Sequence, residues 1–286
     1  MRVLMQSGLR PMVLRLYDPF DTLMALGKQD DEDASESFLD GLSNGLQLLG
    51  NFKMAQSTTR AVQGLLGRVK NGAIAGALSV PGVLNRVVHA LPSACLLIVG
   101  FEGPESRVND DLWRAGQLLT EAGGTDAGPK PGEHWLRRRY DVSFKQSKVY
   151  GAGAFVDTME VATTWDRLFP LFVAVREAVT PYALVMAHFS HAYTDGCSIY
   201  FTFAATRRDP KKALGLYERL WTAALDAAAS VGATASHHHG VGLAKKRAMV
   251  AEHGEMLRVW RSVKDTLDPK GIMNPGKLFP DGAGSV

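Results

Sequence analysis

Cysteine is scarce in this chain of 286 residues, which contains only Cys95 and Cys197. Two isolated cysteines give neither a disulfide framework nor the paired spacing of a zinc site. A chain without disulfides is typical of a reducing compartment, so we expect a cytoplasmic location. Long apolar runs are also absent: the longest, residues 94–101, is far short of the ~20 residues that a membrane-spanning helix needs. We therefore expect no transmembrane segment, and polar residues near the start argue against a signal peptide.

The chain also lacks a strong excess of charge of one sign. Its 32 basic and 29 acidic residues give a net charge of +3. The short basic runs at 137–139 and 245–247 are not interleaved with aromatic residues, as a nucleic-acid platform would be. We expect no nucleic-acid partner, whereas a small anionic substrate suits the balance of charge. Hydrophobic residues make up 46% of the chain, enough to bury a sizeable core.

The pattern of apolar residues predicts an α+β fold with an antiparallel sheet. Residues 183–191 and 198–204 read as two strands of a hairpin, joined by a turn around Asp195 and Gly196. Alternation in the second strand puts Tyr200 on one face and the apolar residues 199, 201 and 203 on the other. Helices over 162–179 and 210–231 are expected to cover one face of the sheet. No Gly-x-Gly-x-x-Gly follows a strand, so a Rossmann nucleotide site is not supported.

Other predicted elements are strands at 12–17 and 94–102 and helices at 38–49, 58–66, 110–122 and 243–267. Residues 124–132 read as a Gly/Pro loop, and Thr163 or Thr164 is the expected cap of the helix over 162–179.

Three segments carry a resemblance to a known family: HAYTDGCSIYFTF at 191–203, SHHHGVG at 236–242 and VKDTLDPKGIMNPGK at 263–277. RLYD at 15–18 and WDR at 165–167 add to it. Together they resemble the C-terminal domain of FAD-linked oxidases of the vanillyl-alcohol-oxidase type, and the alkyldihydroxyacetonephosphate synthase branch more than others. The tail marks only the superfamily, whereas the triple histidine is more specific.

This resemblance implies FAD as cofactor and a substrate-binding cap domain over residues 1–235. It also implies a C-terminal, flavin-facing segment over 236–286. The family's N-terminal FAD-binding domain is expected to be missing from this chain and to act in cis or in trans. The implied reaction exchanges the acyl group of acyl-dihydroxyacetone phosphate, a lipid phosphate ester, for a fatty alcohol. Two alternatives for the function stay open: a FAD-linked oxidoreductase of the D-lactate or glycolate dehydrogenase type, and an inactive isolated cap domain. A homodimer is an open alternative for the oligomeric state.

The resemblance implies four catalytic residues: Tyr200, His237, His238 and His239. Tyr200 matches the family tyrosine that takes a proton from the substrate carbon next to the carbonyl. The alternative is a half-buried structural tyrosine whose hydroxyl is satisfied by a hydrogen bond. A phenol acts as a base near neutral pH only where cationic groups stabilise its phenolate, and the histidines and Arg15 are the expected ones. In an extended loop, alternation would place His237 and His239 on one side and His238 on the other.

Arg15, Arg139 and His191 are the expected substrate contacts, because a guanidinium can grip a phosphate through two donors. Either of the two arginines before Arg139 is an alternative match, and Arg15 is alternatively a partner of Asp18. The expected flavin contacts are Tyr200, His239 and Asn274.

Adjacent histidines are also common metal ligands. However, the sequence places no cysteine or carboxylate near residues 237–239 apart from Asp195, and fixed metals recruit ligands from several elements. We therefore expect no metal in the chain.

Overall fold

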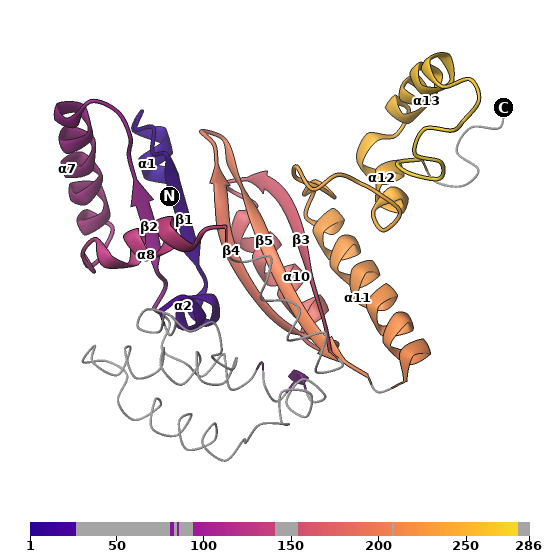
Figure 1. Ribbon diagram of the computed structural model, residues 1–286, viewed down its shortest axis with the longest axis horizontal. Helices are drawn as coiled ribbons and strands as arrows, with labels where there is room; N and C mark the ends of the chain where they lie inside the picture. The colour runs from indigo at the N-terminus through magenta and orange to yellow at the C-terminus, as the bar shows by residue number, and fades with distance from the viewer. Residues whose placement is uncertain (27–80, 83–84, 86–93, 141–153, 208, 280–286) are drawn as a thin grey trace.

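The computed structural model describes residues 1–26, 81–82, 85, 94–140, 154–207 and 209–279. The helices predicted at 38–49 and 58–66 lie outside these residues. Five strands form one sheet in the order β2-β1-β4-β5-β3 (Figure 1). The strands are β1 (Val13–Tyr17), β2 (Leu97–Gly100), β3 (Ala154–Thr164), β4 (Leu184–Ala192) and β5 (Gly196–Thr206).

Every pair of neighbouring strands is antiparallel, so the predicted fold class is confirmed. β4 and β5 form the expected hairpin, in which His188 is paired with Tyr200. On the other side of β5, Glu160 of β3 is paired with Tyr200. This register puts one residue from each of three strands side by side on the same face of the sheet.

Helices α10 (Leu168–Val179) and α11 (Pro210–Ser230) cover the opposite face. Their apolar side chains pack against those of β3, β4 and β5 in a single core, in which Ile199, Phe201 and Phe203 are fully buried. This confirms the predicted inward face of β5. Asp157 of β3 fastens α11 to the sheet, since its carboxylate accepts hydrogen bonds from the Tyr217 hydroxyl at 2.6 Å and the Trp221 indole at 3.0 Å.

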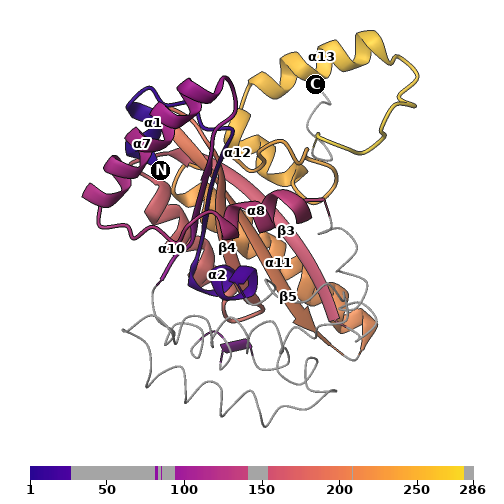
Figure 2. The same cartoon turned by 60° about the vertical axis from the view of Figure 1, so that its left-hand side comes forward.

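The described chain up to Arg138 forms four helices besides β1 and β2: α1 (Arg2–Gln6), α2 (Pro19–Leu26), α7 (Glu105–Glu121) and α8 (Lys130–Arg138). A second hydrophobic core lies between α1, α7 and these two strands. Leu4, Leu9 and Leu14 are buried there against Ala115 of α7. At the other end of the chain, α12 (Met249–His253) follows the 3-10 turn η2 (Lys246–Ala248) and precedes α13 (Met256–Leu267). Figure 2 shows α13 projecting from the rest of the described chain.

Several predicted boundaries were wrong. The helix expected over 162–179 begins only at Leu168, because Thr163 and Thr164 pair with β5 as the last residues of β3. Neither threonine caps the helix; its N-cap is Arg167, which makes no side-chain cap. The expected helix over 243–267 is broken at Gly254, which adopts a positive φ of 49°.

Two further boundaries differ near the second core. α7 begins at Glu105, directly after Pro104, five residues earlier than predicted. Part of the predicted loop at 124–132 belongs to α8, whose first turn contains a proline. In the described part of the chain, no helix is both long and apolar enough to cross a membrane.

Candidate functional site

A buried carboxylate, Glu160, is the centre of the polar face of the sheet. Its neighbours in β3, Met159 and Val161, point into the core beneath α10 and α11, so Glu160 points to the other face. The side chain is 0% exposed. A buried carboxylate is costly unless it is paired, and its partners are therefore the first feature to examine.

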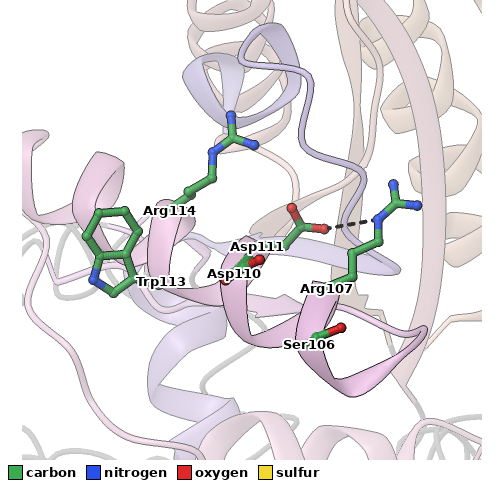
Figure 3. Close-up of a pocket in the computed structure, with 6 residues that line it drawn as sticks. All are labelled: Ser106, Arg107, Asp110, Asp111, Trp113 and Arg114. Atoms are coloured by element: carbon green, nitrogen blue, oxygen red, sulfur yellow. Dashed lines mark ion pairs between the residues drawn. The ribbon is translucent and has the colours of Figure 1, made fainter.

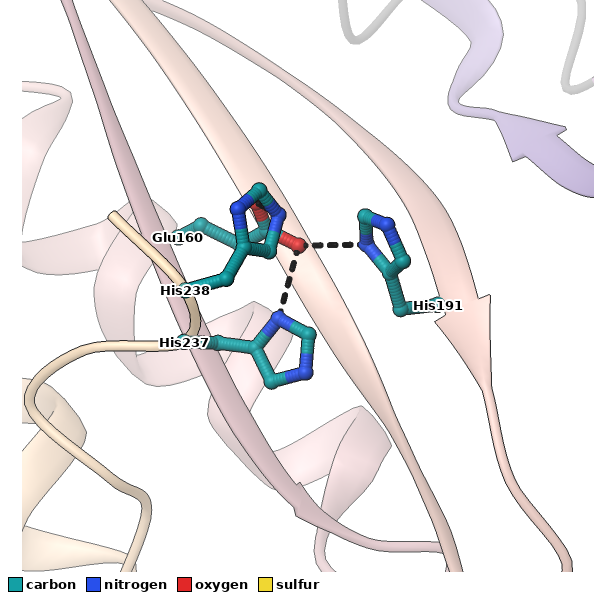
Figure 4. Close-up of side chains that lie close together, drawn as sticks. All are labelled: Glu160, His191, His237 and His238. Carbon is teal, nitrogen blue, oxygen red and sulfur yellow. Dashed lines mark hydrogen bonds and ion pairs between the residues drawn. The ribbon is translucent and has the colours of Figure 1, made fainter. Parts of the chain in front are cut away.

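Four imidazoles surround this carboxylate, and Figure 4 shows three of them, those of His191, His237 and His238. Oε1 lies 2.9 Å from Nδ1 of His191 and 3.2 Å from Nδ1 of His237. Oε2 lies 2.8 Å from Nε2 of His238 and 3.2 Å from Nε2 of His239. The Ser198 hydroxyl donates to Oε1 at 2.6 Å. We call Glu160 and these four histidines the Glu160 cluster.

The expected alternation of the three adjacent histidines was wrong, because all three imidazoles face Glu160. The loop is a tight turn and not an extended segment: His238 has a φ of 40°, and the His239 amide donates to the His237 carbonyl at 2.6 Å. The His237 amide also donates to the Glu160 carbonyl, which fastens the turn to β3.

The turn that carries these histidines is held at its base by a buried lysine. Lys245 donates to the Ser236 hydroxyl at 2.9 Å, and that hydroxyl donates to the Gly240 carbonyl at 2.7 Å. Lys245 is only 4% exposed, and burial lowers the pKa of its amine although acidic groups, Glu160 first, oppose this. The turn is thus closed by contacts at both of its ends.

The partners of Glu160 favour the ionised form of its carboxylate. Burial opposes ionisation, but the hydrogen bonds from Ser198 and His191 and the nearby imidazoles outweigh it and hold the pKa of Glu160 below its usual value. Burial lowers the pKa of His237 and of His239, which favours their neutral forms despite the adjacent carboxylate. A neutral imidazole can accept a proton near neutral pH, and the imidazolium that forms can return it.

Tyr200 lies between this cluster and a second polar group. Its ring stacks on His188 of β4, with 4.6 Å between the centroids, and meets His239 edge-on at 5.2 Å. His188 is buried between Arg15, whose Nη2 lies 2.6 Å from its Nε2, and Asp21, whose Oδ2 lies 3.0 Å from its Nδ1. Burial lowers the pKa of His188. A neutral His188 that donates to Asp21 can accept from Arg15.

The structure therefore brings Arg15, Tyr200, His191 and residues 237–239 to one face of the sheet, although they are far apart in sequence. The alternative pairing of Arg15 with Asp18 was wrong, because Asp18 binds Arg176 at 2.7 Å. Arg139 lies at the exposed end of α8, where it contacts the Leu136 carbonyl and stacks on Tyr140. Asn274 lies in an exposed turn of the C-terminal segment. Neither shares the contacts of the Glu160 cluster.

Sequence reasoning missed Glu160, His188 and Asp21. The statement that no carboxylate lies near the histidines was wrong, since Glu160 contacts all three. The run 154–164 is rich in β-branched residues, which was a signal for a strand, and alternation in that strand puts Glu160 on the face opposite Met159 and Val161.

Four members of the cluster have the makeup of a metal site, because ligand atoms of Glu160, His191, His237 and His238 lie within 4.8 Å of one another. Oε1 of Glu160 is hydrogen-bonded to His191, His237 and Ser198, whereas Oε2 makes no hydrogen bond in the described structure. The absence of a metal stays a prediction.

A surface hollow on α7 lies apart from this face (Figure 3). Its lining includes Trp113 and an ion pair between Arg107 Nε and Asp111 Oδ2 at 3.8 Å. These residues form the polar outer face of an amphipathic helix, so we assign the site to the sheet.

Comparison with known proteins shows the family to which the chain belongs. Residues 1–278 match the family model of the C-terminal domain of FAD-linked oxidases. Alkyldihydroxyacetonephosphate synthase from Dictyostelium discoideum is 32% identical over 66% of this chain and 32% of its own length. The synthase from Trypanosoma brucei brucei is 25% identical over 96% of the chain and 40% of its own length. The chain thus spans about a third to two fifths of these relatives.

Solved structures show the same fold. One of an alkyldihydroxyacetonephosphate synthase matches 96% of this chain and 40% of its own, with a TM-score of 0.55 and 20% identity. A 4-ethylphenol oxidase from Gulosibacter chungangensis matches 95% of this chain and 48% of its own, with a TM-score of 0.54 and 12% identity. The chain belongs to the FAD-linked oxidase C-terminal domain family, and the cofactor of that family is FAD.

Proposed function

We propose that this member of the FAD-linked oxidase C-terminal family supplies the substrate-binding side of a flavoenzyme of the alkyldihydroxyacetonephosphate synthase type. The reaction would exchange the acyl group of acyl-dihydroxyacetone phosphate for a fatty alcohol. The observation that carries the proposal is the convergence of Arg15, Tyr200 and the Glu160 cluster on the sheet face not covered by α10 and α11. The similarity to synthases of two organisms supports this substrate class.

The donors on this face fit an isoalloxazine ring, which presents carbonyl oxygens and ring nitrogens as acceptors. Nε of Arg15 is buried and makes no hydrogen bond in the described structure, so it is an available donor. Tyr200 and His239 would lie along the same ring, and Asn274 would reach it from the C-terminal segment over residues 236–286. When bound, FAD would supply an electrophilic centre that holds the substrate without net redox change. Its adenine and pyrophosphate would be held by a flavin-binding domain, in cis or in trans.

The residues of this chain would handle the protons and the phosphate. The hydroxyl proton of Tyr200 would pass to His239, and the resulting phenolate would take the proton from the carbon next to the substrate carbonyl. The guanidinium of Arg15 would bind the substrate phosphate, and His191, 47% exposed, would contact the substrate from β4. Arg139 lies at the end of α8, away from the Glu160 cluster, so it would have to move toward this face to act as a second phosphate ligand.

An exchange assay tests this proposal. The chain is supplied with a flavin-binding domain and FAD, and mass spectrometry follows the transfer of an isotopically labelled fatty alcohol onto acyl-dihydroxyacetone phosphate. We expect labelled ether product, and a loss of at least ~100-fold in Tyr200→Phe, the scale of general acid-base catalysis. Oxidation of a 2-hydroxy acid by the same preparation, with no ether product, would contradict the proposal.

A further inference from the structure

We propose that Glu160 is a positioning residue that fixes which nitrogen of His191 and of His237 carries the proton. In this arrangement both rings are protonated on Nδ1. The Nε2 atom of each neutral ring then keeps its lone pair and points away from the carboxylate. The inference rests on the proposed function only for the use made of these lone pairs.

The carboxylate imposes this pattern because it can only accept hydrogen bonds. An ionised Glu160 has no proton to donate, so every nitrogen that is hydrogen-bonded to it must be a donor. Oε1 is hydrogen-bonded to the Nδ1 atoms of His191 and His237. Oε2 lies near Nε2 of His238 and of His239 but makes no hydrogen bond in the described structure, so it does not fix the tautomers of these two rings. The neutral imidazole has a single N–H, and therefore its other nitrogen must be an acceptor.

An independent contact supports the assignment for His237. The Tyr193 hydroxyl lies 2.9 Å from Nε2 of His237, on the far side of the ring from Glu160. If Nδ1 carries the proton, Nε2 accepts from this hydroxyl and both nitrogens are satisfied. If Nε2 carried the proton, Nδ1 would face a carboxylate with a lone pair, which is repulsive.

The pattern matters for the site because neutral histidine in water favours the Nε2–H form. Glu160 would hold two of the four rings in the less common form, with Nε2 of His191 free to accept on a side chain that is 47% exposed. A metal ion would require the opposite arrangement, since a metal binds the lone pair of the nitrogen that faces it. The identity of the protonated nitrogen therefore distinguishes a proton-handling cluster from a metal site.

The test is a long-range ¹H–¹⁵N correlation spectrum of the ¹⁵N-labelled full chain at pH about 9, where unperturbed histidines are neutral. Besides His188, whose Nδ1 faces Asp21, we expect two rings in the Nδ1–H form, of which one disappears in His191→Gln and the other in His237→Gln. Both of these signals should be lost in Glu160→Gln and retained in Glu160→Asp, which keeps the charge. Asp195→Asn, which removes an exposed carboxylate of the neighbouring β4–β5 turn, should change neither.

Two outcomes would overturn the inference: His191 and His237 in the Nε2–H form in the unmodified chain, or both Nδ1–H signals unchanged in Glu160→Gln. If Glu160→Gln does not fold, the spectrum of the unmodified chain, assigned with the His191→Gln and His237→Gln variants, still tests the inference. Neither flavin nor substrate is present, so a failure of the exchange reaction would leave this result standing.

Discussion

Buried His188 predicts how the stability of the chain depends on pH. The ring is 7% exposed, and burial lowers its pKa below the value of about 6.5 for a free histidine. Below pH 6.5 the unfolded chain therefore binds a proton at this position that the folded chain does not. The unfolding free energy should consequently fall as the pH falls through this range.

One such proton changes the unfolding free energy by up to about 1.4 kcal/mol per pH unit. Burial lowers the pKa of His237 and His239 as well, so their contributions have the same sign, reduced because both side chains are partly exposed. The His188→Gln variant removes only the first contribution. Glutamine can still accept from Arg15 and donate to Asp21, so the two contacts of the ring are retained.

Urea unfolding at pH about 8.5, 7.5, 6.5 and 5.5 measures the effect, with the slope of each curve checked for two-state behaviour. We expect the unmodified chain to lose up to roughly 1 kcal/mol more than His188→Gln between the two lowest pH values. Between pH about 8.5 and 7.5 the two proteins should change in parallel, because histidine is neutral in both states. Equal losses in acid would refute the claim that His188 is buried in its neutral form.

Three further outcomes follow from the structure. Asp157→Ala removes the acceptor shared by Tyr217 and Trp221 and should lower the unfolding free energy by about 2–4 kcal/mol in urea; a loss under about 0.5 kcal/mol would argue against this anchor. Gly196→Ala would place a Cβ against the Thr163 carbonyl oxygen and should cost about 1–3 kcal/mol by thermal unfolding, whereas an unchanged melting temperature would show that the strands are further apart. The untagged chain should contain no stoichiometric zinc or manganese by elemental analysis, because Glu160 already holds the imidazoles; one metal per chain would contradict this.

The hairpin could be predicted because its residues alternate strictly. In β5, Ile199, Phe201 and Phe203 occupy one side and become fully buried, so the orientation of Tyr200 followed from its position between them. Arg15 and the histidines were identified by motif resemblance. Their meeting on one face requires the sheet and, for residues 237–239, the turn that the His237 amide fastens to the Glu160 carbonyl.

The centre of the site could not be predicted in the same way. Glu160 is an isolated carboxylate in the sequence, and its partners lie 31 residues away at His191 and 77 residues away at His237. His191 is brought to Glu160 by the pairing of β3 with β5 and of β5 with β4, and His237 by the hydrogen bond from its amide to the Glu160 carbonyl. The shared direction of the three adjacent imidazoles depended on the positive φ of His238, a conformation that few non-glycine residues adopt and that periodicity does not reveal.

The most direct test of the account is the visible flavin absorbance of the purified chain. The Glu160 cluster, Arg15 and Tyr200 would form one wall of the flavin site, and most of the buried area and the pyrophosphate contacts would come from the flavin-binding domain. The chain mixed with FAD and passed through gel filtration should emerge colourless and without exchange activity. With a flavin-binding domain supplied in cis or in trans, we predict one FAD per chain and activity that depends on Tyr200. Stoichiometric FAD and turnover from the 286-residue chain alone would contradict the account.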